Sequence, residues 1–381
     1  MSKGSWGGMR VDKKTNKLCL GSFNFIKGIA ICIIVLGHIA VDFDVSRLTW
    51  FYPLFAVLNF LKTPFMPLFF IISGYGFAPN SVKNTFKRMV KSLIVPYLVV
   101  ALLFSLGRPL GECFQTQKWD QFIDKMLSVA LAFLVGVPIP GKILLGYKLS
   151  HCAIVWFLLA LFWAYNTLNL ILKVRRIGLQ VALVLGCAAL GYGLFQLDFT
   201  YYCIPHGLIA TSYFYVGYLL KKYKLIEKGL PRKWMYCLWA AVAALYASWG
   251  YYDLCYGEFR VFIIDYAGVA VLALLILVIG IYLGRFEWKL FNAVNNIGIY
   301  SYWVICIHAI EQKCIPWKML IRATENCPNI GFILTLLIKV IIITSVCKLL
   351  KLLAKMKYRK RKNTYVGKYL RPNHDRSIFG R

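Results

Sequence analysis

Apolar residues run along this chain in long blocks separated by short polar segments, rather than alternating with polar positions. Apolar blocks of about 20 residues match the length of a helix that spans a bilayer. Charged residues make up only 16% of the 381 positions and apolar residues 60%, a balance typical of proteins that cross a membrane repeatedly. The pattern therefore predicts an all-α polytopic membrane protein with about ten transmembrane helices.

The first predicted span covers residues 23–41, and a third begins in a basic run and passes Pro96. Between them, prolines and a Ser-Gly pair interrupt residues 51–77, so we expect two half-helices there. Residues 126–136 are about half the length that a span needs, which predicts a re-entrant or interfacial segment. If this piece crossed instead, every later loop would face the wrong side. The remaining spans are predicted near residues 152–172, 178–196, 206–220, 234–250, 261–284, 297–313 and 330–350.

The formal net charge of +30 would suit a nucleic-acid-binding protein, but the Lys and Arg residues cluster in short segments between apolar runs. That distribution is the positive-inside pattern of a plasma-membrane protein, so the expected partner is the lipid bilayer and not nucleic acid. It places both termini in the cytoplasm. We divide the chain into an N-terminal arm at 1–22, a membrane domain at 23–354 and a basic tail at 355–381 that tethers to anionic lipid.

Neither metal-binding nor glycosylation signals are evident in the sequence. The twelve cysteines are scattered without CxxC spacing, which gives neither a metal site nor a disulfide framework. The sequence contains no Asn-x-Ser/Thr acceptor, as expected of a bacterial source.

The first span carries two ionisable side chains, Lys27 and His38. Eleven positions are about three helical turns, so both lie on one face, about 16 Å apart along the axis. Ionisable groups inside a membrane helix usually face a protein interior or a wet cavity, where they serve function. The alternative is that Lys27 reaches the head groups and His38 is a hydrogen-bonded core histidine.

A second candidate cluster comprises Lys87, Arg88 and Lys91 at the inner end of the third span. Spacing of about one turn can present these cations together, and an anionic ligand such as a phosphate could bind them. Alternatively, they are ordinary positive-inside residues.

The third candidate is His308, which lies about eleven residues, or roughly 16 Å, into the span 297–313. Its depth is expected to match that of His38, which would place both in one cavity. Weaker membrane candidates are expected to be pairing or interface groups rather than catalysts; they are Asp265, Glu311, His206 and His151.

Several segments resemble the acyltransferase 3 family of integral membrane acyltransferases. FNFIKGIAICIIVLGH is similar to the family's opening motif, a basic residue followed by histidine with ten residues between them. PLFFIISGYGF resembles its FFxxSGF signature, KRMVKSLIVPY its basic run and PxY element, WFLLALF its Trp-Phe-Leu segment, and IGIYSYWVICIH its late Ser/Tyr/His span. These matches follow the family order from residue 23 to about 350.

The resemblance implies that Lys27 and His38 form the essential catalytic pair and that Arg88 with Lys91 serves the donor end. We also expect His308 to be catalytic together with His38, Lys87 to assist donor binding, and the substrate to contact Ser73, Tyr302 and Trp156. Lysine stands at 27 and 91 where the family more often has arginine, and Asn24 stands where it usually has aspartate. A lysine offers no planar fork for bidentate contacts.

The expected function is an O-acyltransferase, most plausibly an O-acetyltransferase, that moves an acyl group from cytoplasmic acetyl-CoA to a sugar hydroxyl of a surface glycan or its lipid-linked precursor. Histidine suits the base because its unperturbed pKa lies near neutrality. The alternative from another class is a transporter or flippase for a glycan or small anion, which would also use a broken helix and buried polar groups. A sensor or scaffold with a decayed site is a third possibility.

Overall fold

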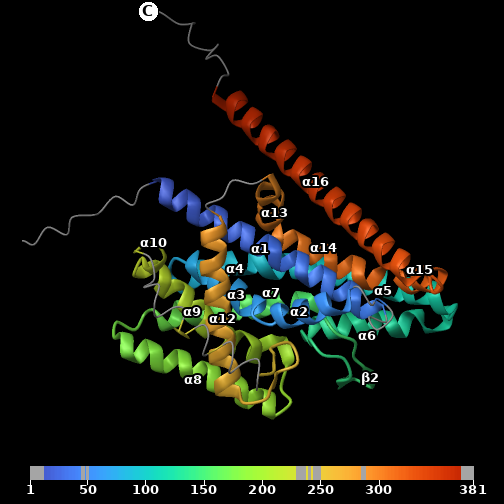
Figure 1. The fold of residues 1–381 in the computed structure, drawn as a ribbon, viewed down its shortest axis with the longest axis horizontal. Helices are drawn as coiled ribbons and strands as arrows, with labels where there is room; N and C mark the ends of the chain where they lie inside the picture. The colour runs from blue at the N-terminus through green and yellow to red at the C-terminus, as the bar shows by residue number, and fades with distance from the viewer. Residues whose placement is uncertain are drawn as a thin grey trace, which may run out of the picture.

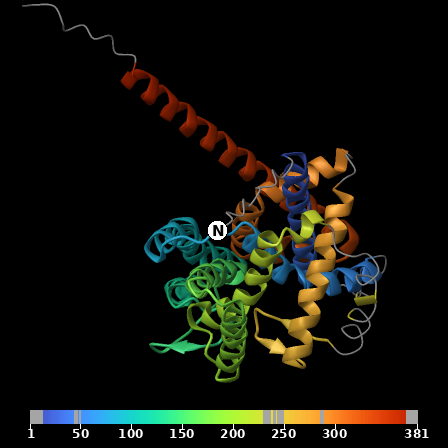
Figure 2. The same cartoon turned by 90° about the vertical axis from the view of Figure 1, so that its left-hand side faces the viewer.

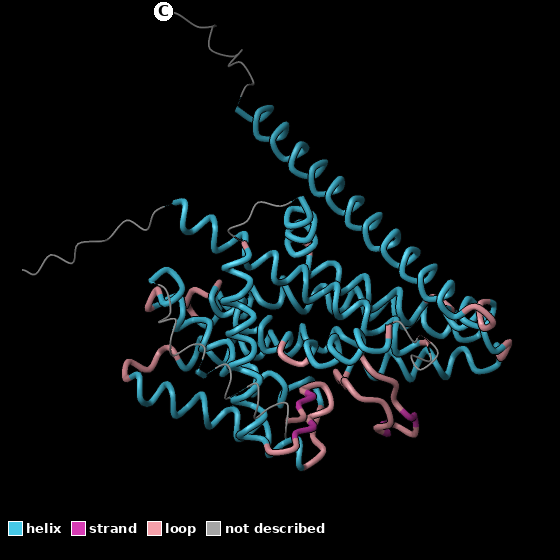
Figure 3. The backbone as a smooth tube through the Cα atoms, viewed as in Figure 1, coloured by secondary structure: helices cyan, strands magenta, loops and turns pink. Residues whose placement is uncertain are grey.

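The computed structural model describes residues 13–43, 48, 51–228, 237–238, 242, 250–284 and 289–369. This part of the chain is almost entirely helical, as Figure 3 shows. The α-helices are α1 Lys13–Asp42, α2 Tyr52–Lys62, α3 Phe65–Tyr75, α4 Val82–Met89, α5 Val95–Thr116, α6 Phe122–Leu134, α7 Trp156–Ile171, α8 Ile177–Gln196, α9 Ile204–Lys222, α10 Leu225–Lys228, α12 Phe262–Leu283, α13 Lys289–Ile299, α14 Ser301–Cys314, α15 Trp317–Ala323 and α16 Pro328–Tyr369.

Short elements complete the fold. A π-helix, η2 (Val90–Ile94), joins α4 to α5, and single 3₁₀ turns η3 (Trp119–Gln121), η4 (Ala153–Val155) and η5 (Tyr201–Cys203) precede α6, α7 and α9. Two antiparallel hairpins have two-residue strands, β1 (Ile143–Leu144) with β2 (Tyr147–Lys148) and β3 (Tyr252–Asp253) with β4 (Glu258–Phe259). The all-α fold class is therefore confirmed for the described residues.

Six described helical stretches are long and apolar enough to cross a membrane, and a bent pair gives a seventh if it is counted as one span. The six are Gly21–Ile39, Val82–Thr116, Ala153–Ile171, Ile177–Gln196, Phe262–Leu283 and Pro328–Leu353. The chain is thus a multi-pass membrane protein, whereas the count of ten spans stays a prediction. The predicted span 234–250 falls largely outside the described residues.

The second predicted span is broken as expected. Helices α2 and α3 each have eleven residues and are separated by Thr63 and Pro64, and each half is too short to cross a bilayer alone. Helix α6, over the predicted segment 126–136, has thirteen residues and is also shorter than a span. Helix α9 covers the predicted span 206–220 but is not among the six; it carries buried polar residues and packs between α3, α7 and α8.

The predicted span 297–313 is not straight. It bends by 77° where α13 meets α14, and α14 begins at Ser301, after Tyr300. The last predicted span, 330–350, is part of the longer helix α16, which continues through the predicted boundary at 354 to Tyr369. Helix α16 begins beside α14 and α15, and its C-terminal part leads away from the other helices in both ribbon views (Figures 1 and 2). Helix α1 likewise begins inside the predicted arm, at Lys13; residues 1–12 and 370–381 lie outside the described part.

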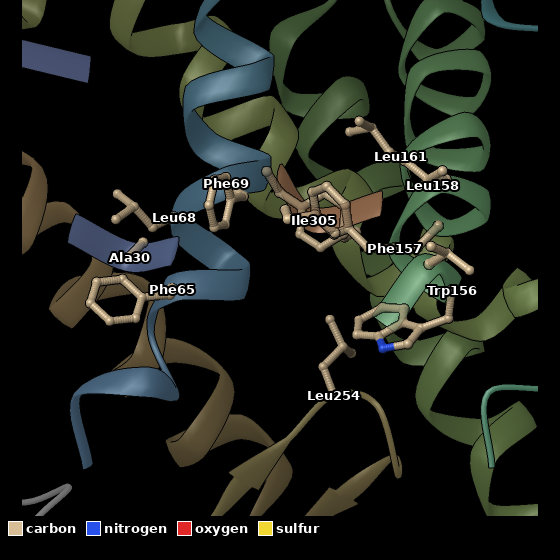
Figure 4. Packing of buried hydrophobic residues seen from close by; sticks show 14 of the residues in the cluster. Ala30, Phe65, Leu68, Phe69, Trp156, Phe157, Leu158, Leu161, Leu254 and Ile305 are labelled. Carbon is tan, nitrogen blue, oxygen red and sulfur yellow. The ribbon is translucent and has the colours of Figure 1, made fainter. Parts of the chain in front are cut away.

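The core is built around α9, which packs against α3, α7 and α8. An ideal Cβ on Gly74 of α3 would lie 1.9 Å from the carbonyl oxygen of Phe214, and one on Gly217 of α9 would lie 1.9 Å from that of Ile71. Only glycine permits this backbone approach, and small residues are what membrane helices use to pack closely. Figure 4 shows the apolar packing between α3 and α7, where Phe69 and Phe157 meet with ring centroids 5.9 Å apart.

Candidate functional site

Helices α1 and α14 bring His38 and His308 into contact. His38 Nδ1 lies 3.0 Å from His308 Nε2, and the ring centroids are 5.1 Å apart. His308 is buried on α14, whereas His38 is only partly buried. The two histidines that the sequence analysis placed at similar depths therefore form a pair, and His38 is its more accessible member.

Behind His308 lies a buried ion pair. His308 Nδ1 is 2.7 Å from Glu311 Oε1, one turn further along α14, and Glu311 Oε2 is 2.8 Å from Lys339 Nζ on α16. The side chains of Glu311 and Lys339 are 3% and 0% exposed. A buried charge is tolerated when it is paired and hydrogen-bonded, and here Lys339 and His308 each contact one oxygen of the Glu311 carboxylate.

Trp317 contacts both members of this ion pair. Its ring lies 4.3 Å from Lys339 Nζ, and its indole Nε1 donates a 2.8 Å hydrogen bond to the backbone oxygen of Glu311. A cation over the face of a tryptophan ring is attracted by the ring quadrupole. Lys339 is therefore held on one side by a carboxylate and on the other by an aromatic face.

We assign one tautomer to each ring from these contacts. A carboxylate only accepts hydrogen bonds, so we assign the Nδ1–H of neutral His308 to Glu311. His308 Nε2 is then an acceptor and takes the Nδ1–H of His38. In this tautomer His38 carries its hydrogen on Nδ1 and none on Nε2. This is the arrangement of a general base with an orienting partner.

The basic run lies elsewhere, on α4 and η2, and Lys87, Arg88 and Lys91 are all exposed. The π-helix η2 interrupts the regular backbone ladder just before Pro96, and such bulges are frequent at functional sites. Here Ser92 Oγ donates to the Arg88 carbonyl at 2.8 Å, and Tyr302 Oη donates to the Ser92 carbonyl at 3.0 Å. Tyr302 thus ties the start of α14 to the segment that carries Lys91.

Lys27 is half-buried on α1 and forms no ion pair or hydrogen bond with the described residues. Ser73 is half-buried on α3. Trp156 is buried at the start of α7 in the hydrophobic core, with its ring centroid 5.0 Å from that of His206 (Figure 4). The expected roles of these three side chains stay predictions.

Among the weaker candidates, three serve local structure. Asp265 accepts hydrogen bonds from the backbone amides of Val261 and Tyr251 at 2.8 and 3.2 Å, and His206 Nε2 lies 3.0 Å from the Cys255 carbonyl oxygen. His151 Nδ1 accepts from the Ala153 amide at 3.0 Å. Burial, with the nearby charges of Arg108 and Lys313, lowers the pKa of His151 to about 3, which makes it a poor base at neutral pH.

Glu311 was expected to be a pairing group near the outer end of its span, and it pairs with both His308 and Lys339. The sequence analysis did not single out Lys339. Its partner Glu311 lies 28 positions earlier on another helix, so no local spacing connects the two residues. One signal was available: a lone lysine inside an apolar helix is itself a candidate functional or paired group.

These features define a multi-pass helical membrane protein with a histidine pair supported by a buried carboxylate and a lysine. A family model described as an acyltransferase domain matches residues 20–351, which is most of the chain. The protein therefore belongs to the acyltransferase 3 family of membrane acyltransferases. No curated protein and no solved structure matches the chain.

Proposed function

We propose that this protein is an O-acetyltransferase that moves the acetyl group of cytoplasmic acetyl-CoA to a hydroxyl of a cell-surface polysaccharide or lipid-linked glycan. The observation that carries the proposal is the contact of His38 with His308, backed by Glu311 and Lys339. Acetyl-CoA as donor and a sugar as acceptor come from the family resemblance. No metal takes part in the proposed reaction.

His38 acts as the general base. A sugar hydroxyl attacks a thioester slowly until its proton is removed, and a positioned histidine typically supplies about 10²- to 10⁴-fold in rate. The hydroxyl proton moves to His38 Nε2 while the oxygen forms a bond to the acetyl carbon. The tetrahedral intermediate then collapses by breaking the carbon–sulfur bond, and the CoA sulfur takes the proton from His38. The products are the acetyl ester and free CoA.

The orienting groups set the strength of this base. Glu311 accepts from His308 Nδ1 at 2.7 Å, which favours the tautomer of His308 that accepts from His38. When His38 becomes an imidazolium, its Nδ1–H points at His308 Nε2, and the Glu311 carboxylate stabilises the positive charge through the ring between them. Lys339 Nζ lies 2.8 Å from the other oxygen of Glu311 and holds the carboxylate in position behind His308.

The donor end of the proposed site uses Arg88 and Lys91, with Lys87 beside them. All three are exposed and can reach the phosphates of CoA, arginine by a planar fork and lysine as a point charge. Lys27 is about 16 Å along the α1 axis from His38, too far for a direct hydrogen bond. In the proposal, Lys27 attracts donor phosphates or a carboxylate at the cytoplasmic side of the site. The enzyme is proposed to lie in the plasma membrane with both termini in the cytoplasm.

The test is acetyl transfer by the detergent-purified protein. With acetyl-labelled acetyl-CoA, we expect slow release of free CoA without acceptor and faster release, with label in the glycan, when an envelope polysaccharide is added. Substrate uptake into protein-containing vesicles with no dependence on acetyl-CoA, together with no CoA release, would overturn the proposal and favour a transporter.

A further inference from the structure

A cavity of about 590 Å³ lies between the last turns of α5, helix α6 and the β1–β2 hairpin. This volume falls within the range of small-molecule sites. Its walls carry charged groups of both signs and several hydroxyls; the charged ones are Arg108, Glu112, Asp124, Lys125 and Lys148, and the hydroxyls are those of Ser128, Tyr147 and Ser150.

The cavity wall is held by its own hydrogen bonds. Arg108 Nε donates to Glu112 Oε1 at 2.8 Å, and Arg108 Nη1 donates to Ser150 Oγ. Lys125 Nζ lies 3.9 Å from Glu112 Oε2. These contacts use two of the five N–H donors of the guanidinium, and the Arg108 side chain is 21% exposed. The Arg108 guanidinium therefore offers hydrogen-bond donors to a ligand, and the neighbouring Glu112 carboxylate offers acceptors.

The α5 turn that forms one wall of the cavity packs against the end of the helix that carries His308. Ideal Cβ atoms on Gly107 and Gly111 of α5 would lie 2.9 Å from Cys314 Sγ and 2.4 Å from the Cys314 carbonyl oxygen, so the end of α14 packs directly on the α5 turn that holds Arg108. Cys314 is six residues beyond His308, a rise of roughly 9 Å. One rigid helix thus connects the catalytic pair to the cavity.

The cavity is also far from the basic run. Arg108 follows Lys91 by seventeen positions on the continuous helical stretch Val82–Thr116, a rise of roughly 25 Å. A donor bound at Arg88 and Lys91 would therefore approach the histidine pair from one end of the helices, and a ligand in the cavity would approach it from the other.

We propose that this cavity binds the saccharide acceptor, a site that rests on the proposed O-acetyltransferase function. Sugar hydroxyls both donate and accept hydrogen bonds, which matches the mixed set of Arg108, Glu112, Asp124 and Lys125. The lining combines three cations with two carboxylates, so a neutral polar ligand matches it better than a polyanion, some of whose phosphates would lie beside the carboxylates. An apolar ligand would leave all five charged groups without hydration. Tyr147 adds an aromatic face against which a sugar ring packs.

The experiment is direct binding of three trisaccharides, maltotriose, chitotriose and trigalacturonate, to the detergent-purified full chain by saturation-transfer NMR. Wild type is compared with Asp124→Asn and Lys125→Met, which change cavity residues. The matched controls are Asp120→Asn and Lys118→Met, which make the same charge changes at exposed positions outside the cavity. Free CoA release from acetyl-CoA without acceptor is measured on all five proteins.

The proposal predicts that at least one trisaccharide binds wild type and both controls, with a Kd below roughly 10 mM. Affinity should fall at least tenfold in each cavity variant while CoA release without acceptor is unchanged. Equal affinity in cavity and control variants, or no binding of any of the three, would overturn the saccharide site. If the cavity variants lose trisaccharide binding but wild type releases no CoA, the saccharide site is supported and the proposed function is overturned. The experiment therefore distinguishes failure of the site from failure of the function.

Discussion

His38 Nδ1 lies 3.0 Å from His308 Nε2, which joins two helices across 270 positions of sequence. The hydrogen bond makes the more exposed histidine dependent on the buried one, because the orientation of His38 is set by the ring behind it. The Glu311 carboxylate and Lys339 ammonium extend the same line of contacts into the core. The predictions below separate the parts of this arrangement.

His308 should act through His38. We expect His308→Gln to lower kcat for acetyl transfer by about 10²-fold, within the range for a base–orienter pair, while KM for acetyl-CoA stays within about twofold because His308 is buried on α14. The check is steady-state CoA release across pH 5 to 9. The pH at which the rate reaches half its maximum should move in the variant, since a merely structural role would lower the rate without changing the pH profile.

Glu311 and Lys339 should be coupled in stability. Removing one partner of a buried ion pair leaves an uncompensated charge at a cost of about 3–5 kcal/mol, so Glu311→Gln and Lys339→Met should each lower the melting temperature in detergent. The double variant should melt close to wild type but remain slow in acetyl transfer, because His308 has lost its orienting carboxylate. Additive destabilisation in the double variant would contradict the coupling.

Arg88 and Lys91 should bind the donor. We expect the double variant Arg88→Ala with Lys91→Ala to raise Kd for acetyl-CoA at least tenfold at low salt. Added salt should narrow the difference in Kd between this variant and wild type because exposed charges are screened. The matched control removes two exposed arginines after α7, Arg175→Ala with Arg176→Ala. Kd is measured by equilibrium dialysis with labelled acetyl-CoA. If both double variants weaken binding equally, general positive charge and not a donor site explains the affinity.

Gly217 should be essential for packing α9 on α3. Its ideal Cβ would lie 1.9 Å from the Ile71 carbonyl oxygen, so Gly217→Ala must push the two backbones apart, at a cost of about 1–3 kcal/mol or more. Gly186 of α8 has nothing within 4 Å of its ideal Cβ, and Gly186→Ala is the control. Melting temperatures in the same detergent should fall for the first variant only.

His151 should make the protein less stable in acid. Its folded pKa of about 3 is lowered from 6.5, so between these values the unfolded chain takes up a proton that the folded chain refuses. Stability is therefore lost as pH falls from about 6.5 toward 3. The melting temperature of wild type should drop more between pH 7 and pH 5 than that of His151→Gln. An identical drop in both would show that His151 is not responsible.

Much of this fold follows from local sequence signals. The mostly apolar run at 23–41 lies within α1, and the prolines at 64 and 67 accompany the break between α2 and α3. The 77° bend before α14 was not predictable in the same way, because Tyr300 and Ser301 are no stronger helix breakers than many residues inside helices. The helix there is turned by tertiary packing, which a linear pattern does not record.

The candidate site was predictable only in part. His38 and His308 stand out because histidine is rare inside apolar spans, and equal depth brought them together as a hypothesis. Glu311 could be recognised as polar but not as the partner of His308, and Lys339 depends on a contact between two helices whose orientation the sequence does not specify. The cavity near Arg108 combines α5, α6 and a hairpin, so it exists only in three dimensions.

The most direct test of the central claim is free CoA release from acetyl-CoA by the purified wild type, His38→Ala and His151→Gln. The account predicts turnover in wild type, a loss of about 10²- to 10⁴-fold in His38→Ala as expected for a general base, and turnover near the wild-type rate in His151→Gln. Undiminished CoA release by His38→Ala, with the protein folded and binding acetyl-CoA, would contradict the assignment of the base to His38.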